Sequence, residues 1–468
     1  MHEIHVDVAI VGGGLAGLVA ANRLAQLGRA ALVIEKGEDE LYPCNSRVSG
    51  GALHLCMQDI TAPPQEIERR IGVTTDGAAR PDLAAAAART GARAVEWLRS
   101  EGARFIRVPS TYQNHVLAPP RPARGGLHWQ GRGPDVLLRS LERNLVDRGG
   151  RLMRATEARH LVMENGRCKG LLATGRGGDF TVTARAVILA DGGYQADADL
   201  LRRYITPRPD RVKLRNARTG AGSGLRMAEA AGAALAGMEN GFYGHLLCRD
   251  AMDNDALWPF PVIDHIAAAG IVVGVDGRRF ADEGAGGIFL SNAVARLSDP
   301  LSAVAIFDTP IWETAGRHRA IPPNPSLVIG GGEVVEAGSL AALAEALELP
   351  AAALAATVDA YNAALSVGDG ARLEPPRSNL AAARRIETAP FLAIRLCAGV
   401  TYTFGGIAHD ENGRVLDGSG RAIEGLFAAG ATTGGLEGGP RNGYVGGLSK
   451  AAIFGLRAAE FIGGEPQA

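Results

Sequence analysis

The stretch VDVAIVGGGLAG at residues 6–17 joins an apolar run to a glycine-rich turn. The run is typical of a buried parallel strand, and the Ala- and Leu-rich residues that follow predict a helix to about residue 28. In such a turn Gly12 permits the tight bend, Gly14 lets the backbone approach a pyrophosphate, and Gly17 lets the helix pack on the sheet. A second strand then ends at Glu35, where a carboxylate is expected to accept ribose hydroxyls. The stretch therefore predicts a dinucleotide-binding βαβ unit.

Segments of similar character recur far along the chain. An apolar strand at 182–190 closes on Asp191-Gly192-Gly193, and another at 425–430 precedes a helix from about 447 to 462. Residues that look nucleotide-binding thus stand near both ends of the sequence. We expect them to belong to one domain.

The intervening residues look like an insertion. They contain a proline-rich loop at 321–325 and an Ala/Leu-rich helical run at 340–365. We therefore predict an α/β protein, with a Rossmann-like domain formed by residues 1–240 and 396–468 and an α+β capping domain at 241–395.

The composition limits the classes of partner. The 49 Lys and Arg residues balance 50 Asp and Glu residues, which argues against nucleic acid as the main partner. Five scattered cysteines form no CxxC or Cys/His cluster, so we expect free thiols, no metal and a reducing, cytoplasmic location. No secretory signal and no membrane span are expected, because no apolar run is long enough.

Two further glycine-rich clusters favour FAD over a nicotinamide dinucleotide. Small residues and hydroxyls at 45–51 (NSRVSGG) could lie against the pyrophosphate and the flavin ring, where larger side chains would collide. The last predicted helix starts near Gly446-Gly447-Leu448, and its N-terminus could stabilise the negative charge of a reduced flavin.

The chain resembles the fumarate reductase/succinate dehydrogenase flavoproteins, in the wide sense that includes ketosteroid and tricarballylate dehydrogenases and urocanate reductases. The resemblance implies an FAD domain in two parts and an active site where the cap closes over the flavin. It is carried by six stretches: the GGGLAG turn with Glu35-Lys36, residues 45–51, TGAGSGLRMA at 219–228, GRRFADE at 277–283, Gly405-Gly406, and residues 430–447.

The motifs and the resemblance together predict the residues that hold FAD. They are Gly12, Gly14, Ala16, Gly17, Glu35, Lys36, Asn45, Ser46, Ser49, Gly50, Gly51, Ala158, Ala190, Asp191, Gly192, Gly430, Ala431, Arg441, Gly446, Gly447 and Leu448. Asp191 and Ala431 depart from the family pattern. The position of the covalent histidine of succinate dehydrogenases falls near Cys44, so we expect FAD to be bound without a covalent bond.

The family's catalytic positions are only partly kept. The resemblance places Arg441 where a substrate carboxylate is bound, and His245 and Tyr402 where substrate-binding histidines stand. Val262-Ile263 replace the Thr–Glu pair of the proton path, Ile266 replaces the arginine after it, and Gly287 replaces the proton-donating arginine. The chain is therefore not expected to be a fumarate reductase.

These departures favour oxidation of a saturated ketone or keto acid, possibly cyclic. A flavin accepts hydride from a carbon β to a carbonyl when a base removes the α proton. Tyr402 is the expected base, with its pKa lowered by a cation such as Arg441; His245 would hold the carbonyl, and Tyr444 is a further candidate. Electrons would pass to an external acceptor. Two alternatives remain open: a reductase of activated C=C bonds, and a flavoprotein electron-transfer subunit.

Overall fold

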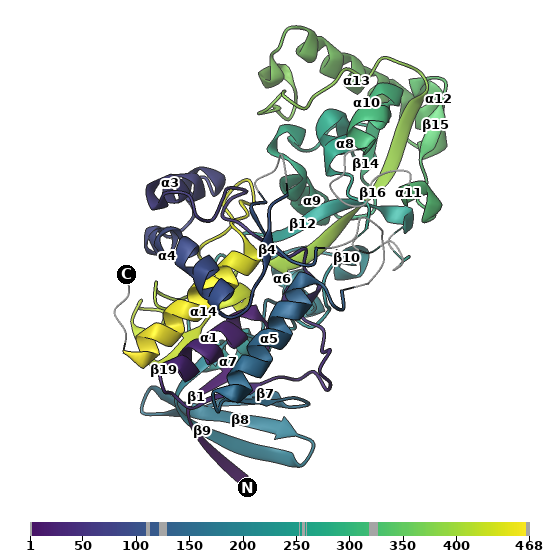
Figure 1. Cartoon of the computed structure of the whole chain (residues 1–468). Helices are drawn as coiled ribbons and strands as arrows, with labels where there is room; N and C mark the ends of the chain where they lie inside the picture. The colour runs from purple at the N-terminus through teal and green to yellow at the C-terminus, as the bar shows by residue number, and fades with distance from the viewer. Residues whose placement is uncertain are drawn as a thin grey trace.

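The computed structural model describes residues 2–108, 113–120, 129–251, 253–254, 258, 260–317 and 326–464. Figure 1 shows two parts, one built from both ends of the chain and one from its middle. The first part contains a sheet in the order β18-β19-β9-β1-β2-β6, extended by β8 and β7. Its strands are β1 (His2–Val11), β2 (Ala31–Ile34), β6 (Arg151–Met153), β7 (Glu157–Glu164), β8 (Arg167–Gly175), β9 (Gly178–Leu189), β18 (Arg414–Leu416) and β19 (Ala422–Ala428).

The predicted βαβ unit is present at the centre of this sheet. Strand β1 pairs in parallel with β2 through Val8 and Ala31, and with β9 through Val11 and Leu189. Helix α1 (Leu15–Gln26) connects β1 to β2. The apolar run of β1 is buried from Val8 to Val11, as expected for a strand that is covered on both faces.

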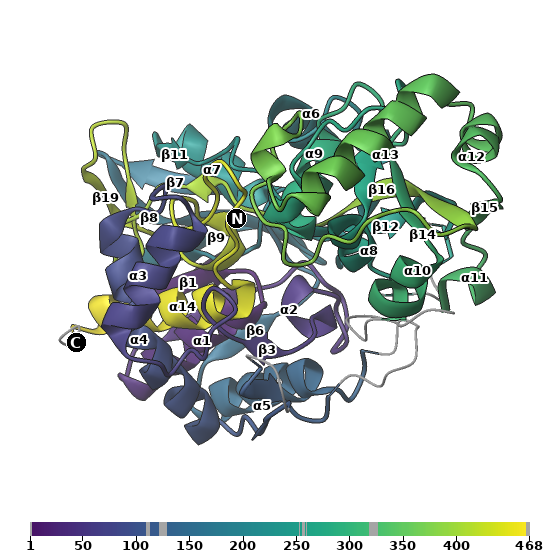
Figure 2. The ribbon, with the colours of Figure 1, turned by 90° about the horizontal axis from the view of Figure 1, so that it is seen from above.

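Helices from both ends of the chain share one face of the sheet. They are α1, α3 (Pro64–Thr74), α4 (Pro81–Ser100), α5 (Gly133–Asp147) and α14 (Gly447–Gly463). Apolar side chains of these five helices and of β1 form one core, and Figure 2 shows α14 lying beside α1. The first and last helices pack closely, since a Cβ atom at Gly455 would lie 2.7 Å from the carbonyl oxygen of Ala16. The two ends of the sequence therefore belong to one domain.

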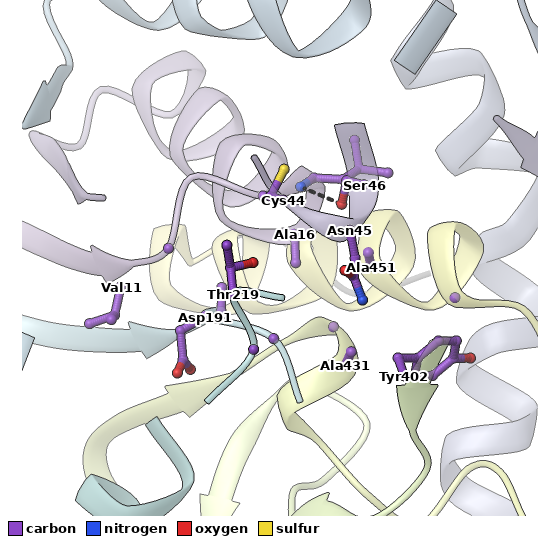
Figure 3. A pocket seen from close by; sticks show the side chains of 18 of the residues that line it. Val11, Ala16, Cys44, Asn45, Ser46, Asp191, Thr219, Tyr402, Ala431 and Ala451 are labelled. Carbon is purple, nitrogen blue, oxygen red and sulfur yellow. Dashed lines mark hydrogen bonds between the residues drawn. The ribbon is translucent and has the colours of Figure 1, made fainter. Parts of the chain in front are cut away.

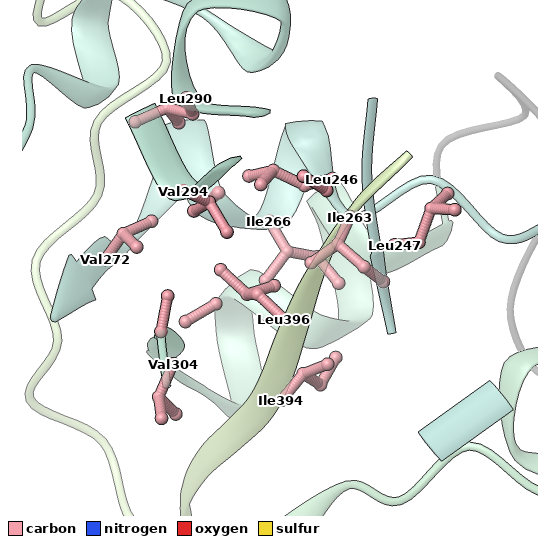
Figure 4. Packing of buried hydrophobic residues seen from close by; sticks show 14 of the residues in the cluster. Leu246, Leu247, Ile263, Ile266, Val272, Leu290, Val294, Val304, Ile394 and Leu396 are labelled. Atoms are coloured by element: carbon pink, nitrogen blue, oxygen red, sulfur yellow. The ribbon is translucent and has the colours of Figure 1, made fainter. Parts of the chain in front are cut away.

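The middle of the chain forms a second sheet with its own core. Its strands are β10 (Lys213–Leu214), β12 (Phe242–Cys248), β13 (Ile271–Val273), β14 (Val304–Asp308), β15 (Val335–Ala337) and β16 (Phe391–Thr403). Helices α8 (Asp264–Ala269) and α9 (Gly287–Ala295) pack on it, and Figure 4 shows Ile266, Val294 and Leu396 meeting in the core. Strand β16 continues past the predicted boundary at 395/396, and β10 joins the sheet from before residue 241.

The remaining regular elements connect or cover these two parts. They are α2 (Asn45–Val48), β3 (Ala52–Leu53), β4 (Phe105–Ile106), β5 (His115–Leu117), α6 (Ala198–Tyr204), α7 (Ser223–Ala230), β11 (Leu235–Ala236), α10 (Thr309–Thr314), α11 (Ser326–Ile329), α12 (Leu340–Leu347), α13 (Ala351–Ser366) and β17 (Gly406–Ile407). The helical run predicted at 340–365 is interrupted, because Glu348 adopts φ 58° and Pro350 precedes α13. The proline-rich loop at 321–325 lies outside the described residues. Within the described ranges, no helix is both long and apolar enough to cross a bilayer.

Substitution of Gly17 by Ala is expected to destabilise the first domain. A Cβ atom there would lie 2.0 Å from the carbonyl oxygen of Gly12, so α1 would have to move away from the turn. Overpacking of this kind costs about 3 kcal/mol when neighbouring backbone cannot yield. Thermal unfolding measures the effect, with Gly72→Ala as control, because a Cβ atom at Gly72 meets nothing within 4 Å. Equal melting temperatures for the two variants would contradict this account of the turn.

Candidate active site

A cavity opens at the carboxyl ends of β1, β2 and β9. Its empty volume is about 1230 Å³, including space open to solvent. In Figure 3 the labelled lining residues extend from Val11 and Asp191 to Tyr402, with Cys44, Asn45 and Ser46 between them. The predicted FAD residues that line the cavity are Gly12, Gly14, Ala16, Glu35, Lys36, Asn45, Ser46, Ser49, Ala158, Ala190, Asp191, Gly192, Gly430, Ala431, Gly447 and Leu448.

The turn before α1 is held by its own hydrogen bonds. Gly12 adopts φ 102°, and a Cβ atom there would lie 2.6 Å from the carbonyl oxygen of Ala190. The carboxylate of Glu35 accepts the N–H of Gly13 at 2.8 Å and the N–H of Gly37 at 2.7 Å. Glu35 therefore shapes the turn in addition to facing the cavity, where it could accept the predicted ribose hydroxyls.

Helix α2 closes the cavity on one side. Ser46 Oγ accepts the N–H of Leu15 at 3.1 Å, which ties α2 to the first turn of α1 (Figure 3). The amide of Asn45 donates to the carbonyl oxygen of Thr401 at 3.0 Å and accepts the N–H of Ala217 at 2.9 Å. Asn45 thus connects the first domain to the second sheet at the edge of the cavity.

Four predicted FAD glycines lie behind the lining. Gly17 supports α1 from beneath, and Gly51 packs against Pro134 and Leu117. Gly446 approaches the carbonyl oxygen of His54, while Gly50 faces open space. Gly17, Gly51 and Gly446 allow close approach of the segments that line the cavity, and direct contact of these four positions with FAD stays a prediction.

The chemistry of the lining fits a polar dinucleotide. Gln195, only 2% exposed, lines the cavity, and its Oε1 has no hydrogen-bond partner in the described part of the chain. Such a buried acceptor is costly unless a ligand or water satisfies it. The Oδ1 atom of Asp191 is also unpartnered among these residues, and burial raises the pKa of this carboxyl. Burial also raises the pKa of the Cys44 thiol to about 11, which keeps it protonated.

Three tyrosines form one end of the cavity: Tyr243, Tyr402 and Tyr444. The rings of Tyr243 and Tyr444 stack with their centroids 4.0 Å apart, and Tyr402 lies 5.9 Å from Tyr243. The hydroxyl of Tyr444 accepts the N–H of Gly447, at the start of α14, at 3.2 Å. This end of the cavity combines aromatic walls with hydroxyl groups, a common lining of small-molecule sites.

The partner of Tyr402 overturns its assignment as a base with a lowered pKa. Its hydroxyl donates to Glu437 Oε1 at 2.6 Å. Glu437 is buried and also lies 3.3 Å from Nζ of buried Lys450. Burial, followed by the negative charge of Glu437, raises the pKa of Tyr402 well above its usual value. Tyr402 therefore stays protonated at neutral pH and is anchored to the loop before α14.

His245 reaches the cavity only through Tyr243, which corrects its predicted role of holding the substrate carbonyl. Nδ1 of His245 lies 2.6 Å from Asp264 Oδ2, and Nε2 lies 3.1 Å from the hydroxyl of Tyr243. A carboxylate at Nδ1 fixes the proton on that nitrogen, which leaves Nε2 to accept from Tyr243. Asp264, His245 and Tyr243 thus form a hydrogen-bonded chain that ends at the cavity wall.

Gly287 leaves space for the hydrogen-bonded chain of Asp264, His245 and Tyr243. A Cβ atom at Gly287 would lie 1.9 Å from Cγ of Asp264, so a larger residue would displace this carboxylate. The glycine at position 287 therefore leaves room for Asp264. Sequence reasoning missed Asp264 and Tyr243, although Tyr243 stands two residues before His245 and so on the same face of a strand.

Arg441 is not among the residues that line the cavity, and its predicted roles toward FAD and a substrate carboxylate stay predictions. Its guanidinium forms an ion pair with Asp76, with Nε 3.0 Å from Oδ2, and half of its side chain is exposed. Two main-chain hydrogen bonds between Gly438 and Gly443 close the turn that carries Arg441. The turn places the arginine against Asp76 in the loop after α3.

Residues 7–444 match the family described as "FAD binding domain". Among curated relatives, the NADH:acrylate oxidoreductase of Vibrio harveyi is 28% identical over 77% of this chain and 34% of its own length. The NADH:fumarate oxidoreductase of Klebsiella pneumoniae is 27% identical over 97% of this chain and 47% of its own length. The chain thus spans only a third to a half of these two proteins.

Other relatives are matched over most of their length. The 4-oxocyclohexanecarboxylate 2-dehydrogenase of Sinomonas cyclohexanicum is 26% identical over 91% of this chain and 87% of its own length. The crystal structure of the 3-ketosteroid Δ4-(5α)-dehydrogenase of Rhodococcus jostii superposes with a TM-score of 0.76 at 21% identity, covering 99% of this chain and 98% of that one. The match over residues 7–444 places the chain in the FAD-binding fumarate reductase/succinate dehydrogenase flavoprotein family.

Proposed function

We propose that this enzyme desaturates the C–C bond next to the carbonyl of a ketone or keto acid, preferably a cyclic one. The observation that carries the proposal is the hydrogen-bonded chain from Asp264 through His245 to Tyr243, whose ring lines the cavity. A hydroxyl held by a neutral imidazole is a general base for removal of a weakly acidic proton. Tyr243 takes the role that the sequence suggested for Tyr402.

The proton follows the hydrogen bonds already present. Tyr243 Oη takes the α proton of the ketone while its own proton passes to His245 Nε2. The resulting imidazolium is stabilised by the carboxylate of Asp264 at Nδ1. FAD, held by the lining residues of the cavity, would supply the redox chemistry as the acceptor of the β hydride.

The neighbouring tyrosines orient the substrate. Tyr444, whose hydroxyl accepts the N–H of Gly447, would donate to the ketone oxygen and stabilise the enolate. Tyr402 is held by Glu437 and shapes the wall. The lining residues named above would hold FAD without a covalent bond, since the Cys44 thiol is protonated. An external acceptor would reoxidise the flavin.

Two observations support oxidation over reduction. The relative from Sinomonas cyclohexanicum, matched over 87% of its length, is named for dehydrogenation of a cyclic ketone. The positions of the fumarate reductase proton path hold Val262, Ile263, Ile266 and Gly287 in this chain, none of which carries a proton. Reduction of an activated C=C bond is the second candidate, because the acrylate and fumarate oxidoreductases are also relatives.

An anaerobic substrate screen separates the two directions. We expect the absorbance of oxidised flavin to disappear when the holoenzyme is mixed with cyclohexanone, 4-oxocyclohexanecarboxylate or a saturated 3-ketosteroid. Succinate serves as the control without a ketone. If none of these ketones bleaches the flavin, and only cyclohexenone or acrylate reoxidises the reduced enzyme, the desaturase proposal is wrong and the reductase is favoured.

Replacement of Tyr243 by Phe is expected to slow flavin reduction by the ketone about 10²–10⁴-fold, because the base is lost. FAD content should stay unchanged. Tyr402→Phe is the matched control: it removes the hydroxyl of a neighbouring tyrosine that is already committed to Glu437, and we expect at most a tenfold loss. Stopped-flow absorbance measures both rates. A larger loss for Tyr402→Phe than for Tyr243→Phe would reverse the assignment of the base.

Replacement of Arg441 by Ala is expected to leave flavin reduction within about threefold of the wild type. The side chain is half exposed and paired with Asp76, and such surface pairs contribute about 1 kcal/mol or less. Asp76→Ala, which removes the other member of the pair, should behave alike in the same assay. A loss of rate specific to Arg441→Ala, with a raised KM for 4-oxocyclohexanecarboxylate but not for cyclohexanone, would show that Arg441 binds the carboxylate after all.

A further inference from the structure

Arg215 is a buried cation beside the tyrosine end of the cavity that neither the motifs nor the family positions indicate. Its residue exposure is 7%, and its Nη1 donates to Thr401 Oγ1 at 3.2 Å. Thr401 lines the cavity next to Tyr402. A guanidinium taken out of water at this place needs a compensating negative charge or a functional reason.

The register of the second sheet brings Arg215 close to the proposed base. Strands β10 and β12 pair with opposite edges of β16: Leu214 and Gly244 both face Val400. Arg215 follows β10 directly, and its N–H donates to the carbonyl oxygen of Val400 at 2.8 Å. Tyr243 faces Tyr402 on the other edge, at an irregularity between Tyr243 and Gly244. Arg215 and Tyr243 therefore stand on either side of the same short stretch of β16.

Several titratable groups from different elements surround Tyr243. It meets His245 of its own strand, Asp264 of α8 through that histidine, Tyr402 of β16, and Tyr444 of the loop before α14. Arg215 interacts electrostatically with Tyr243 and Asp264, and both raise its pKa against the opposing, larger effect of burial. The cation near Tyr243 is thus Arg215, which directly follows β10.

We propose that Arg215 is a positioning residue that stabilises the partial negative charge on the oxygen of Tyr243 as the proton of Tyr243 moves to His245, with Thr401 holding the guanidinium of Arg215 in place. This inference rests on the proposed function, because it assigns Arg215 to the same proton transfer. A cation near Tyr243 and His245 favours the form of the pair that has lost a proton, whichever of the two groups carries the charge.

The test compares three variants of the holoenzyme: Arg215→Met, Arg215→Lys and Lys213→Met. Lys213 is the matched control, since it is equally buried and two residues away, but its Nζ lies over the ring of Phe260 at 4.9 Å. Flavin reduction by the best ketone of the screen is measured against pH. FAD content and melting temperature are measured alongside, so that misfolded protein is recognised.

For Arg215→Met we expect flavin reduction at neutral pH to slow about tenfold or more. The rising limb of the plot of flavin-reduction rate against pH should move to higher pH by about one unit or more. The reason is that removal of a nearby cation disfavours proton loss from the Tyr243–His245 pair. The rate should recover toward that of the wild type at high pH, which damage to the fold would not allow. Arg215→Lys should retain most of the rate, and Lys213→Met should follow the wild-type profile.

A wild-type profile for Arg215→Met, or a loss of rate at every pH without displacement of the limb, would overturn the assignment of Arg215. Failure of the desaturase proposal is distinguishable, because in that case none of the ketones would bleach the flavin of the wild-type enzyme. In that case the ultraviolet absorbance of tyrosinate, followed against pH without substrate, tests Arg215 directly. Arg215→Met should displace to higher pH a tyrosine ionisation that Tyr243→Phe abolishes; an unchanged titration in Arg215→Met overturns the inference.

Discussion

The two hydrogen bonds that the Glu35 carboxylate accepts from Gly13 and Gly37 shape the turn on which the cofactor cavity is built. The close approach of this turn to Ala190 brings the ends of β1 and β9 together, and α14 returns from the other end of the chain to lie against α1. The cavity therefore exists only when residues more than four hundred positions apart are packed together. The walls of the cavity depend on these close backbone contacts.

The second sheet brings the proposed acid–base residues to this cavity. Strand β16 pairs with β10, β12, β14 and β15 and is thus the central strand of that sheet. It ends beside the three tyrosines, so one continuous strand runs from the second sheet to the cavity. Asp264 and His245 lie behind Tyr243 where the glycine at position 287 leaves space. The absence of a side chain at position 287 thus makes room for the carboxylate of the Asp264–His245–Tyr243 chain.

Electrostatic partners decide which of several similar side chains can act. Tyr402 and Tyr243 both line the cavity, but the first donates to a buried carboxylate and the second to an imidazole. A phenol beside a carboxylate holds its proton, whereas a phenol beside a neutral imidazole can pass it on. Likewise, Arg441 is neutralised by Asp76 at the surface, while Arg215 is buried near Tyr243.

The sequence by itself determined the α/β fold, the turn of the FAD-binding domain and most of the cavity lining. These features are local: a strand, a glycine turn, a helix and a carboxylate follow one another within thirty residues, so their spacing is readable. The partners of Tyr402 and Arg441, Glu437 and Asp76, come from segments that only folding brings near. Only the tertiary structure decided the placement of Tyr243, Asp264 and Arg215, because they stand on separate elements and no spacing along the chain encodes their proximity. Strand register and loop packing decide which charged group lies beside which hydroxyl. Both arise only when the core is assembled.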